Sequence, residues 1–232
     1  MHKPGWGIRL TGDVIDLGYW ESGLQPPFDP WIEIESGERV LRSESFDELA
    51  SGEDVRVTGI ALIDRLNGAF AISHQARSVK LNGVVEFTAT GKVNRHIFVA
   101  HATFEIRGVA ANITVETFGP DGKPSPTPPP QPSPVQSWSS TAEQDPVLDD
   151  ALIYFGKATD WFDLYKALES LELKAGGKQA FLALGWASAS QIKLLKRTAN
   201  WARHAKRKNP PPPQPMDFAE ARTLVAYFSG AH

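Results

Sequence analysis

Residues 119–140, GPDGKPSPTPPPQPSPVQSWSS, contain eight prolines and divide the chain into two parts of different character. Proline lacks a backbone N–H, so a run this dense cannot supply the hydrogen-bond donors of a helix or a sheet. We therefore predict an extended polyproline II linker over residues 119–143. It would join an N-terminal domain, residues 1–118, to a C-terminal domain, residues 144–232.

The N-terminal part has the alternation and composition of β-strands. Residues 31–35, WIEIE, alternate apolar and polar side chains, which is typical of a strand with one face in water. Residues 55–63, VRVTGIALI, are rich in β-branched residues and precede Asn67-Gly68, which favours a hairpin turn because both residues tolerate positive φ. Further expected elements are strands at 84–88, 96–106 and 113–118, a strand-like stretch around Asp13 and Asp16, and a helical turn at 45–49. Short strands between turn residues predict an antiparallel β-sandwich or barrel.

The C-terminal part has the start and stop signals of helices. Asp145 and Pro146 provide an N-cap and a first helical residue, and Thr159 is expected to cap the next helix. Residues 188–191 and 217–220 both match a capping box. The expected helices cover residues 146–157, 160–175, 178–184, 189–205 and 218–230. The chain is therefore predicted to be an α+β protein of two domains, the second a four- to five-helix bundle.

Composition excludes several classes of protein. Of the 232 residues, 41% are hydrophobic and 22% are charged, as in ordinary folded proteins. The lack of cysteine excludes disulfides, thiolate metal sites and cysteine nucleophiles. No apolar run is long enough to span a bilayer and the first seven residues show no signal-peptide core, so we expect a cytoplasmic protein with no membrane partner. Glycine-rich phosphate loops and histidine pairs at metal-ligand spacing are lacking, so we expect neither cofactor nor metal.

Positive charge is concentrated in one segment of a chain whose net charge is −3. Residues 173–216 contain no Asp or Glu. The basic residues of this segment are Lys174, Lys178, Lys193, Lys196, Arg197, Arg203, Lys206, Arg207 and Lys208. Such a field is expected for a partner that carries phosphate groups. We therefore take Lys193, Lys196, Arg203, Lys206, Arg207 and Lys208 as candidate nucleic-acid-binding residues; the alternative is that some of them only complement the C-terminal end of a helix.

Three polar residues of the long helix expected at 189–205 fall on one ridge. Arg197 and His204 are seven residues apart, so they differ by about 20° around the helix axis and by roughly 10 Å along it. Asn200 lies between them on the same side. A guanidinium, an amide and an imidazole are therefore expected side by side.

Arg197 and His204, with six residues between them, resemble a motif of the HEPN superfamily. Helical domains of that superfamily carry an arginine and a histidine, with four to six residues between them, near the end of a long helix of a four- or five-helix bundle. Residues 161–166, 202–205 and 215–222 also look like parts of uncharacterised bacterial domains of this type. The resemblance covers residues 145–230 and does not extend to the N-terminal part.

The resemblance implies a chemistry for this ridge. Active HEPN proteins are metal-independent ribonucleases that usually work as dimers. His204 would act as general acid or base at a ribose 2′-hydroxyl, Arg197 would hold the scissile phosphate, and Asn200 would orient it. Many HEPN proteins are instead inactive binding modules. Asn200, Arg203 and His204 could likewise form a purely structural network at the helix end.

Two hypotheses about function follow. The first is a non-catalytic binding protein, in which the β domain recognises a ligand or a protein and the basic helical bundle serves assembly or nucleic-acid contact. The alternative is a metal-independent endoribonuclease that uses Arg197 and His204, in toxin or defence biology. The partners implied are RNA, a protein bound by the β domain or the proline-rich linker, and a second copy of the chain at the helical domain.

Overall fold

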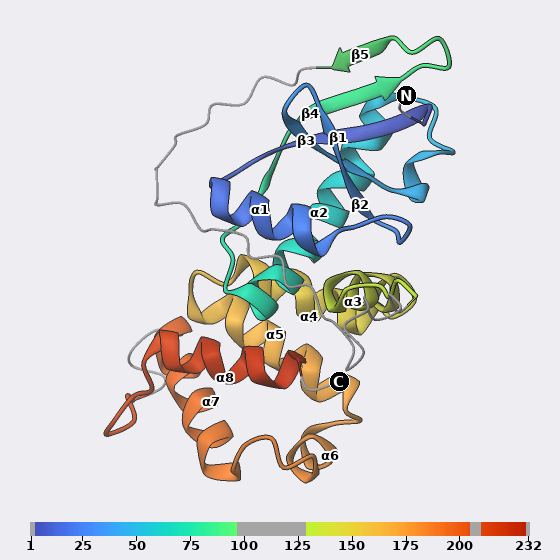
Figure 1. The fold of residues 1–232 in the computed structure, drawn as a ribbon. Helices are drawn as coiled ribbons and strands as arrows, with labels where there is room; N and C mark the ends of the chain where they lie inside the picture. The colour runs from blue at the N-terminus through green and yellow to red at the C-terminus, as the bar shows by residue number, and fades with distance from the viewer. Residues whose placement is uncertain (1–2, 97–128, 205–209, 231–232) are drawn as a thin grey trace, which may run out of the picture.

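A computed structural model describes residues 3–96, 129–204 and 210–230 of the chain. A β-sheet with two helices on one side forms one half of the molecule, and helices form the other (Figure 1). The predicted strand at 113–118, most of the strand at 96–106 and the first part of the proline-rich linker lie outside the described residues. The α+β class is confirmed.

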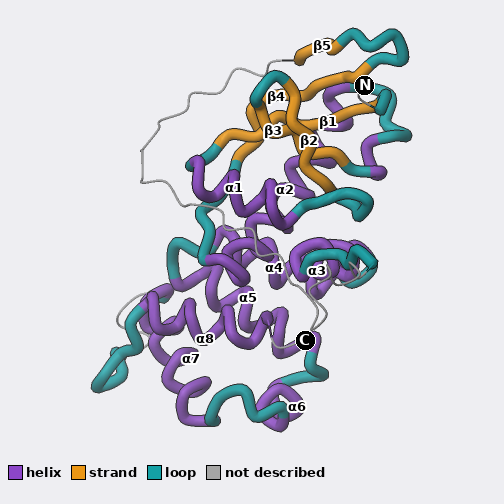
Figure 2. Tube along the Cα trace, viewed as in Figure 1, coloured by secondary structure: helices purple, strands orange, loops and turns teal. Residues whose placement is uncertain are grey.

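The sheet is open rather than closed into a barrel. It has five antiparallel strands in the order β2-β3-β1-β4-β5. The strands are β1 (Gly5–Thr11), β2 (Trp31–Glu35), β3 (Glu38–Arg42), β4 (Lys80–Phe87) and β5 (Val93–His96). The strand expected at 31–35 is confirmed, and that at 84–88 is the second half of β4. Since β2 and β5 are edge strands that do not meet, the described sheet is neither the barrel nor the sandwich that we predicted (Figure 2).

Eight α-helices and one 3₁₀ turn complete the described residues. They are α1 (Val14–Gly23), η1 (Glu44–Phe46), α2 (Gly52–His74), α3 (Pro134–Glu143), α4 (Pro146–Lys157), α5 (Trp161–Lys174), α6 (Lys178–Ala183), α7 (Ala189–Arg203) and α8 (Phe218–Gly230). The turn expected near 45–49 corresponds to η1, and the five C-terminal helices are confirmed with small shifts at their ends. The predicted cap Thr159 is wrong, because the Asp160 side chain accepts the N–H groups of Phe162 and Asp163.

The prediction of a strand at 55–63 is wrong, because these residues lie within the 23-residue helix α2. A strand would put Val55 and Val57 on the same face. Val55 is fully buried whereas Val57 is 57% exposed, as their different positions around a helix require. Ser51 caps the helix by accepting the Asp54 N–H. Burial of one face on the sheet overrides the preference of β-branched residues for strands.

Two carboxylates expected in a strand belong to helix α1. Asp13 is the N-cap, and its Oδ1 accepts the Ile15 N–H at 2.9 Å. Asp16 is buried, and its Oδ1 accepts the Arg77 N–H at 3.1 Å. The strand prediction for this stretch is wrong, because Asp13 caps helix α1 and Asp16 lies within it. Both side chains accept hydrogen bonds from backbone N–H groups.

Asn67 does not form the predicted hairpin turn. It lies inside α2, where its buried side chain pairs with the backbone of Val79 just ahead of β4. Its Nδ2 donates to the Val79 carbonyl at 2.9 Å, and its Oδ1 accepts the Val79 N–H at 2.8 Å. These two bonds attach the chain leading into β4 to the helix, so a residue typical of turns here makes a tertiary contact.

Gly68 lies at the crossing of α2 and α4, opposite Gly156. A β-carbon on Gly156 would lie 2.7 Å from the Gly68 nitrogen and 3.0 Å from its α-carbon. A β-carbon on Gly68 would overlap the carbonyl group of Leu152. The two helix backbones therefore touch, which only glycine permits at this distance.

Helix α3 occupies the last part of the predicted linker. Pro134 takes the first helical position, where a missing N–H costs nothing, and Ser133 and Gln136 form a capping box. The buried Gln136 amide also donates to the carbonyls of three residues that precede β2. These acceptors are Gln25, Phe28 and Pro30. The linker prediction is therefore wrong for residues 134–143.

The two halves of the molecule share packed side chains and an ion-pair network. Val135, Leu148 and Leu152 belong to the same apolar cluster as residues of the sheet half, such as Trp20 and Phe70. Arg65 of α2 adds polar contacts. Its Nε donates to Asp149 at 2.6 Å, and its Nη1 pairs with Glu143 at 3.1 Å.

Replacing Gly68 with alanine should lower the free energy of unfolding by about 3 kcal/mol or more, because backbone atoms of α4 cannot move aside without separating the helices. Chemical denaturation followed by circular dichroism measures this. The matched control is Gly18→Ala on α1, where a β-carbon would have no neighbour within 4 Å. That variant should be unchanged or more stable by up to about 1 kcal/mol. Equal effects of the two substitutions would contradict the close crossing.

Asn67→Leu should cost about 2–4 kcal/mol, because it keeps the side-chain volume but leaves the Val79 N–H and carbonyl buried without partners. Asn94→Leu is the control, since Asn94 lies on β5 and only its bond to Glu86 would be lost. The control should change stability by less than about 1 kcal/mol. Hydrogen exchange at the Val79 amide would show whether the loss is local, and unchanged protection there would argue against the proposed role of Asn67.

Candidate nucleic-acid interface and a cavity between the two halves

Helix α7 carries most of the residues that the sequence identified as functional. Ser188 and Gln191 form the predicted capping box at its start. Ile192, Leu195 and Ala199 are buried, and the Oγ1 of the buried Thr198 accepts the Met216 N–H at 3.1 Å. This face fixes the rotation of the helix, so its opposite face lies in solvent.

Lys196, which the sequence predicted to bind nucleic acid, forms an ion pair within the helical half. Its ammonium group pairs with the buried carboxylate of Glu172 on α5, and it lies 5.9 Å from the centre of the Tyr165 ring. Its side chain is only 20% exposed. The positive charge of Lys196 is therefore largely offset inside the helical half.

Arg203 is likewise engaged within the chain. Its guanidinium carbon lies 3.8 Å from the centre of the Tyr165 ring, in stacking contact. Its Nη2 and Nε donate to the Asn200 Oδ1 at 2.8 and 3.1 Å. An arginine stacked on an aromatic ring and bonded to an amide is held in one orientation. The pair formed by Asn200 and Arg203 matches part of the structural network considered as an alternative.

Lys193, Arg197 and His204 are exposed on the free side of α7. Asn200 is half-buried between Arg197 and His204, and His204 forms the C-terminal cap position of the helix. We call Lys193, Arg197, Asn200 and His204 the α7 basic ridge. Lys206, Arg207 and Lys208 follow it in the sequence but lie outside the described residues.

The described residues place neither a metal-binding cluster nor one of the two described cavities at the α7 basic ridge. Over residues 3–96, 129–204 and 210–230, no three His, Asp or Glu side chains are grouped so that they could hold a metal ion. The helices within these ranges fall short of a bilayer crossing in length or apolar content. The two cavities described in the molecule do not include Arg197 or His204. The ridge is an open surface.

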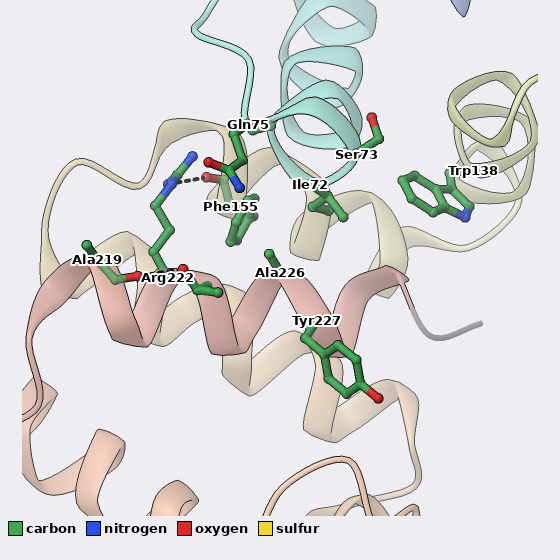
Figure 3. A pocket seen from close by; sticks show the side chains of 11 residues that line it. Ile72, Ser73, Gln75, Trp138, Phe155, Ala219, Arg222, Ala226 and Tyr227 are labelled. Atoms are coloured by element: carbon green, nitrogen blue, oxygen red, sulfur yellow. Dashed lines mark hydrogen bonds between the residues drawn. The ribbon is translucent and has the colours of Figure 1, made fainter.

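A cavity of about 660 Å³ lies between the two halves of the molecule, and no sequence pattern indicated it. It lies where the C-terminal end of α2 and helices α3, α4 and α8 come together (Figure 3). Ile72, Trp138, Phe155 and Ala226 supply apolar surface, and Gln75 and Arg222 supply polar groups. Four separate segments build this site, so no motif could reveal it.

Arg222 is the cation of this cavity. Its Nη1 donates to the carbonyls of Phe155 at 3.1 Å and Ala158 at 2.7 Å, and its guanidinium carbon lies 4.4 Å from the centre of the Phe155 ring. Figure 3 shows the side chain rising from α8 towards Gln75 and Phe155. Burial lowers the pKa of Arg222 from its ordinary value, because the desolvated charge has only neutral partners among the described residues.

Ser73 and His74 lie beside this cavity at the end of α2. Ser73 Oγ and His74 Nδ1 are 2.6 Å apart, and Ser73 Oγ also bonds the Ala69 carbonyl one helical turn earlier. The imidazole packs on the Tyr19 ring at 4.8 Å, and this desolvation lowers the pKa of His74. Because the serine hydroxyl bonds its own helix, the pair acts structurally at the end of α2.

Comparison of the chain with protein-family models, with curated proteins and with solved structures finds no match in any of the three.

Proposed function

We propose that this chain is a non-catalytic binding protein that contacts RNA through the α7 basic ridge. The observation that supports this most directly is that Lys193, Arg197 and His204 are exposed along one helix, within a segment, residues 173–216, that has no acidic residue. A row of cations without interspersed carboxylates attracts the phosphates of a nucleic acid.

The ion pairs of the helical half decide which cations belong to this surface. Lys196 is paired with Glu172, and Arg203 is stacked on Tyr165. These two residues position the helix and contribute little field at the surface. Lys193 and Arg197 would make the phosphate contacts instead, and the exposed His204 lies on the same ridge.

An open helix ridge suits contact with a strand of single-stranded RNA, which needs no deep site. Two helical turns, roughly 10 Å, separate Arg197 from His204, a span of one to two nucleotides along an RNA strand. The half-buried Asn200 lies between them, and the Nδ2 of its amide can donate to ribose or base groups. The resemblance to HEPN domains supports RNA as the partner over DNA.

Cleavage is the second candidate function. It is favoured by one observation, which is that Arg197 and His204 are both exposed on the same side of α7. Acid–base cleavage needs a donor and an acceptor of protons at the same bond. A second copy of the chain, related by two-fold symmetry at α7, would supply the second imidazole.

The sheet half would recognise a protein in this proposal. Its strand β2 is an edge strand and carries Ile34, which is 46% exposed. An extended peptide can add to such an edge through backbone hydrogen bonds. This assignment leaves RNA contact to the helical half.

Lys193→Glu with Arg197→Glu should weaken binding of a single-stranded RNA oligonucleotide by about tenfold or more and reduce its salt dependence by about two phosphate contacts. Fluorescence anisotropy at several salt concentrations measures both. The control is Lys80→Glu with Lys92→Glu, which makes the same change of net charge on exposed residues of the sheet half. RNA affinity that falls equally in both double variants would mean that only overall charge matters, and would remove the ridge from the proposal.

Purified protein incubated with RNA in EDTA should leave the RNA intact, because the α7 basic ridge, as far as the structure describes it, has one imidazole and no second group to transfer a proton at the same bond. Gel electrophoresis of end-labelled RNA checks this. Cleavage that disappears in both Arg197→Ala and His204→Ala, but persists in His74→Ala, would replace the binding proposal with the ribonuclease alternative. Cleavage that survives in the first two variants would point to a contaminant.

A further inference from the structure

The cavity between the two halves contains a positive charge that no acidic side chain of the described residues offsets. Arg222 forms no ion pair in the described part of the chain, and the described residues lining the cavity include no Asp or Glu. Its Nη1 donates hydrogen bonds to two carbonyl oxygens. A guanidinium that has already lost part of its hydration attracts an anion strongly, because the attraction between opposite charges is larger where water is excluded.

The geometry of Arg222 is fixed before any ligand arrives. The carbonyls of Phe155 and Ala158 at the end of α4 hold one nitrogen, and the Phe155 ring lies against the guanidinium. A planar group held in this way presents its remaining N–H groups in a constant direction. Little side-chain entropy is then lost when a ligand binds.

The walls of the cavity are apolar and partly aromatic. Ile72 of α2, Trp138 of α3, Phe155 of α4 and Ala226 of α8 surround the space next to Arg222 (Figure 3). Its volume of about 660 Å³ is within the range of sites for small organic molecules. An aromatic body would stack on such walls, whereas a small inorganic anion would leave them in contact with water.

We propose that this cavity binds an amphipathic carboxylate with an aromatic body, whose carboxylate pairs with Arg222 and whose ring packs between Trp138, Ile72 and Ala226. A singly charged head group matches Arg222, the one cation among the described residues that line the cavity. Gln75 and Ser73, which also line the cavity, can bond the second carboxylate oxygen or its water. The site is separate from the α7 basic ridge, so this inference goes beyond RNA contact and stands or falls without it.

Such a ligand would also join the two halves of the molecule. It would touch α2 and α3 on one side and α8 on the other, so it would bind the folded arrangement and not the unfolded chain. Binding should therefore raise the melting temperature, and the rise should continue with the logarithm of the ligand concentration after the site is saturated.

The test uses biphenyl-4-carboxylate and its neutral analogue biphenyl-4-carboxamide, with isothermal titration calorimetry and thermal unfolding of the full chain. The acid should bind wild-type protein with a dissociation constant below about 1 mM, and the carboxamide at least about tenfold more weakly. Arg222→Gln should weaken binding of the acid by about tenfold or more. Arg56→Gln is the control, because Arg56 pairs with Glu53 near the start of α2, far from the cavity, and its loss should leave binding unchanged.

Ala226→Trp provides a second variant, since it fills the cavity and leaves Arg222 in place. It should abolish binding of the acid, and it decides the matter if Arg222→Gln does not fold. Failure of the acid to bind wild-type protein, equal binding of acid and carboxamide, or unchanged binding by Ala226→Trp would each overturn the proposal. RNA affinity, measured separately, should be the same in Ala226→Trp and wild-type protein.

Discussion

The contact between Gly68 and Gly156 is the one on which the rest of the structure depends. It lets the backbones of α2 and α4 touch, and it lies between the sheet half and the helical half. Helix α2 is long enough to serve both. Near its start Gly59 is so close to Ile8 of β1 that a β-carbon would overlap that side chain, and near its end Gly68 meets α4. One helix thus fixes the position of both halves.

This crossing also places the cavity and its cation. Beyond Gly68 the helix continues to His74, and Gln75 ends it in the left-handed conformation with φ of 52°. That short extension brings Ile72 and Gln75 opposite α8. Arg222 then binds the carbonyls at the end of α4, the same helix that Gly68 contacts. The cavity is therefore a consequence of where α2 crosses α4.

Charge in the helical half is divided between internal and external roles. Glu172 of α5 neutralises Lys196, and Tyr165 of the same helix holds Arg203. The contacts that stabilise α7 therefore use the two basic residues nearest α5, and Lys193 and Arg197 remain at the surface. A count of lysines and arginines along the segment could not separate these roles, because the acid that offsets Lys196 lies outside the segment, 24 positions earlier.

Local signals in the sequence determined much of the helical half. The caps at Asp145 and Ser188 act within three residues of themselves, so the starts of α4 and α7 were predictable. The rotation of α7, and with it the shared side of Arg197 and His204, also followed from local periodicity. The alternation at 31–35 fixed β2 for the same reason.

Only the tertiary structure decided the role of residues that serve distant partners. The β-branched run at 55–63 is helical because one face of α2 packs on the sheet. Asn67 and Gly68 form no turn, because Asn67 bonds the Val79 backbone and Gly68 lies against the backbone of α4. The cavity is built by Ile72, Trp138 and Arg222 from three separate helices. Periodicity and capping describe interactions over a few residues, whereas close backbone approach and charge pairing depend on which surfaces meet once the chain has folded.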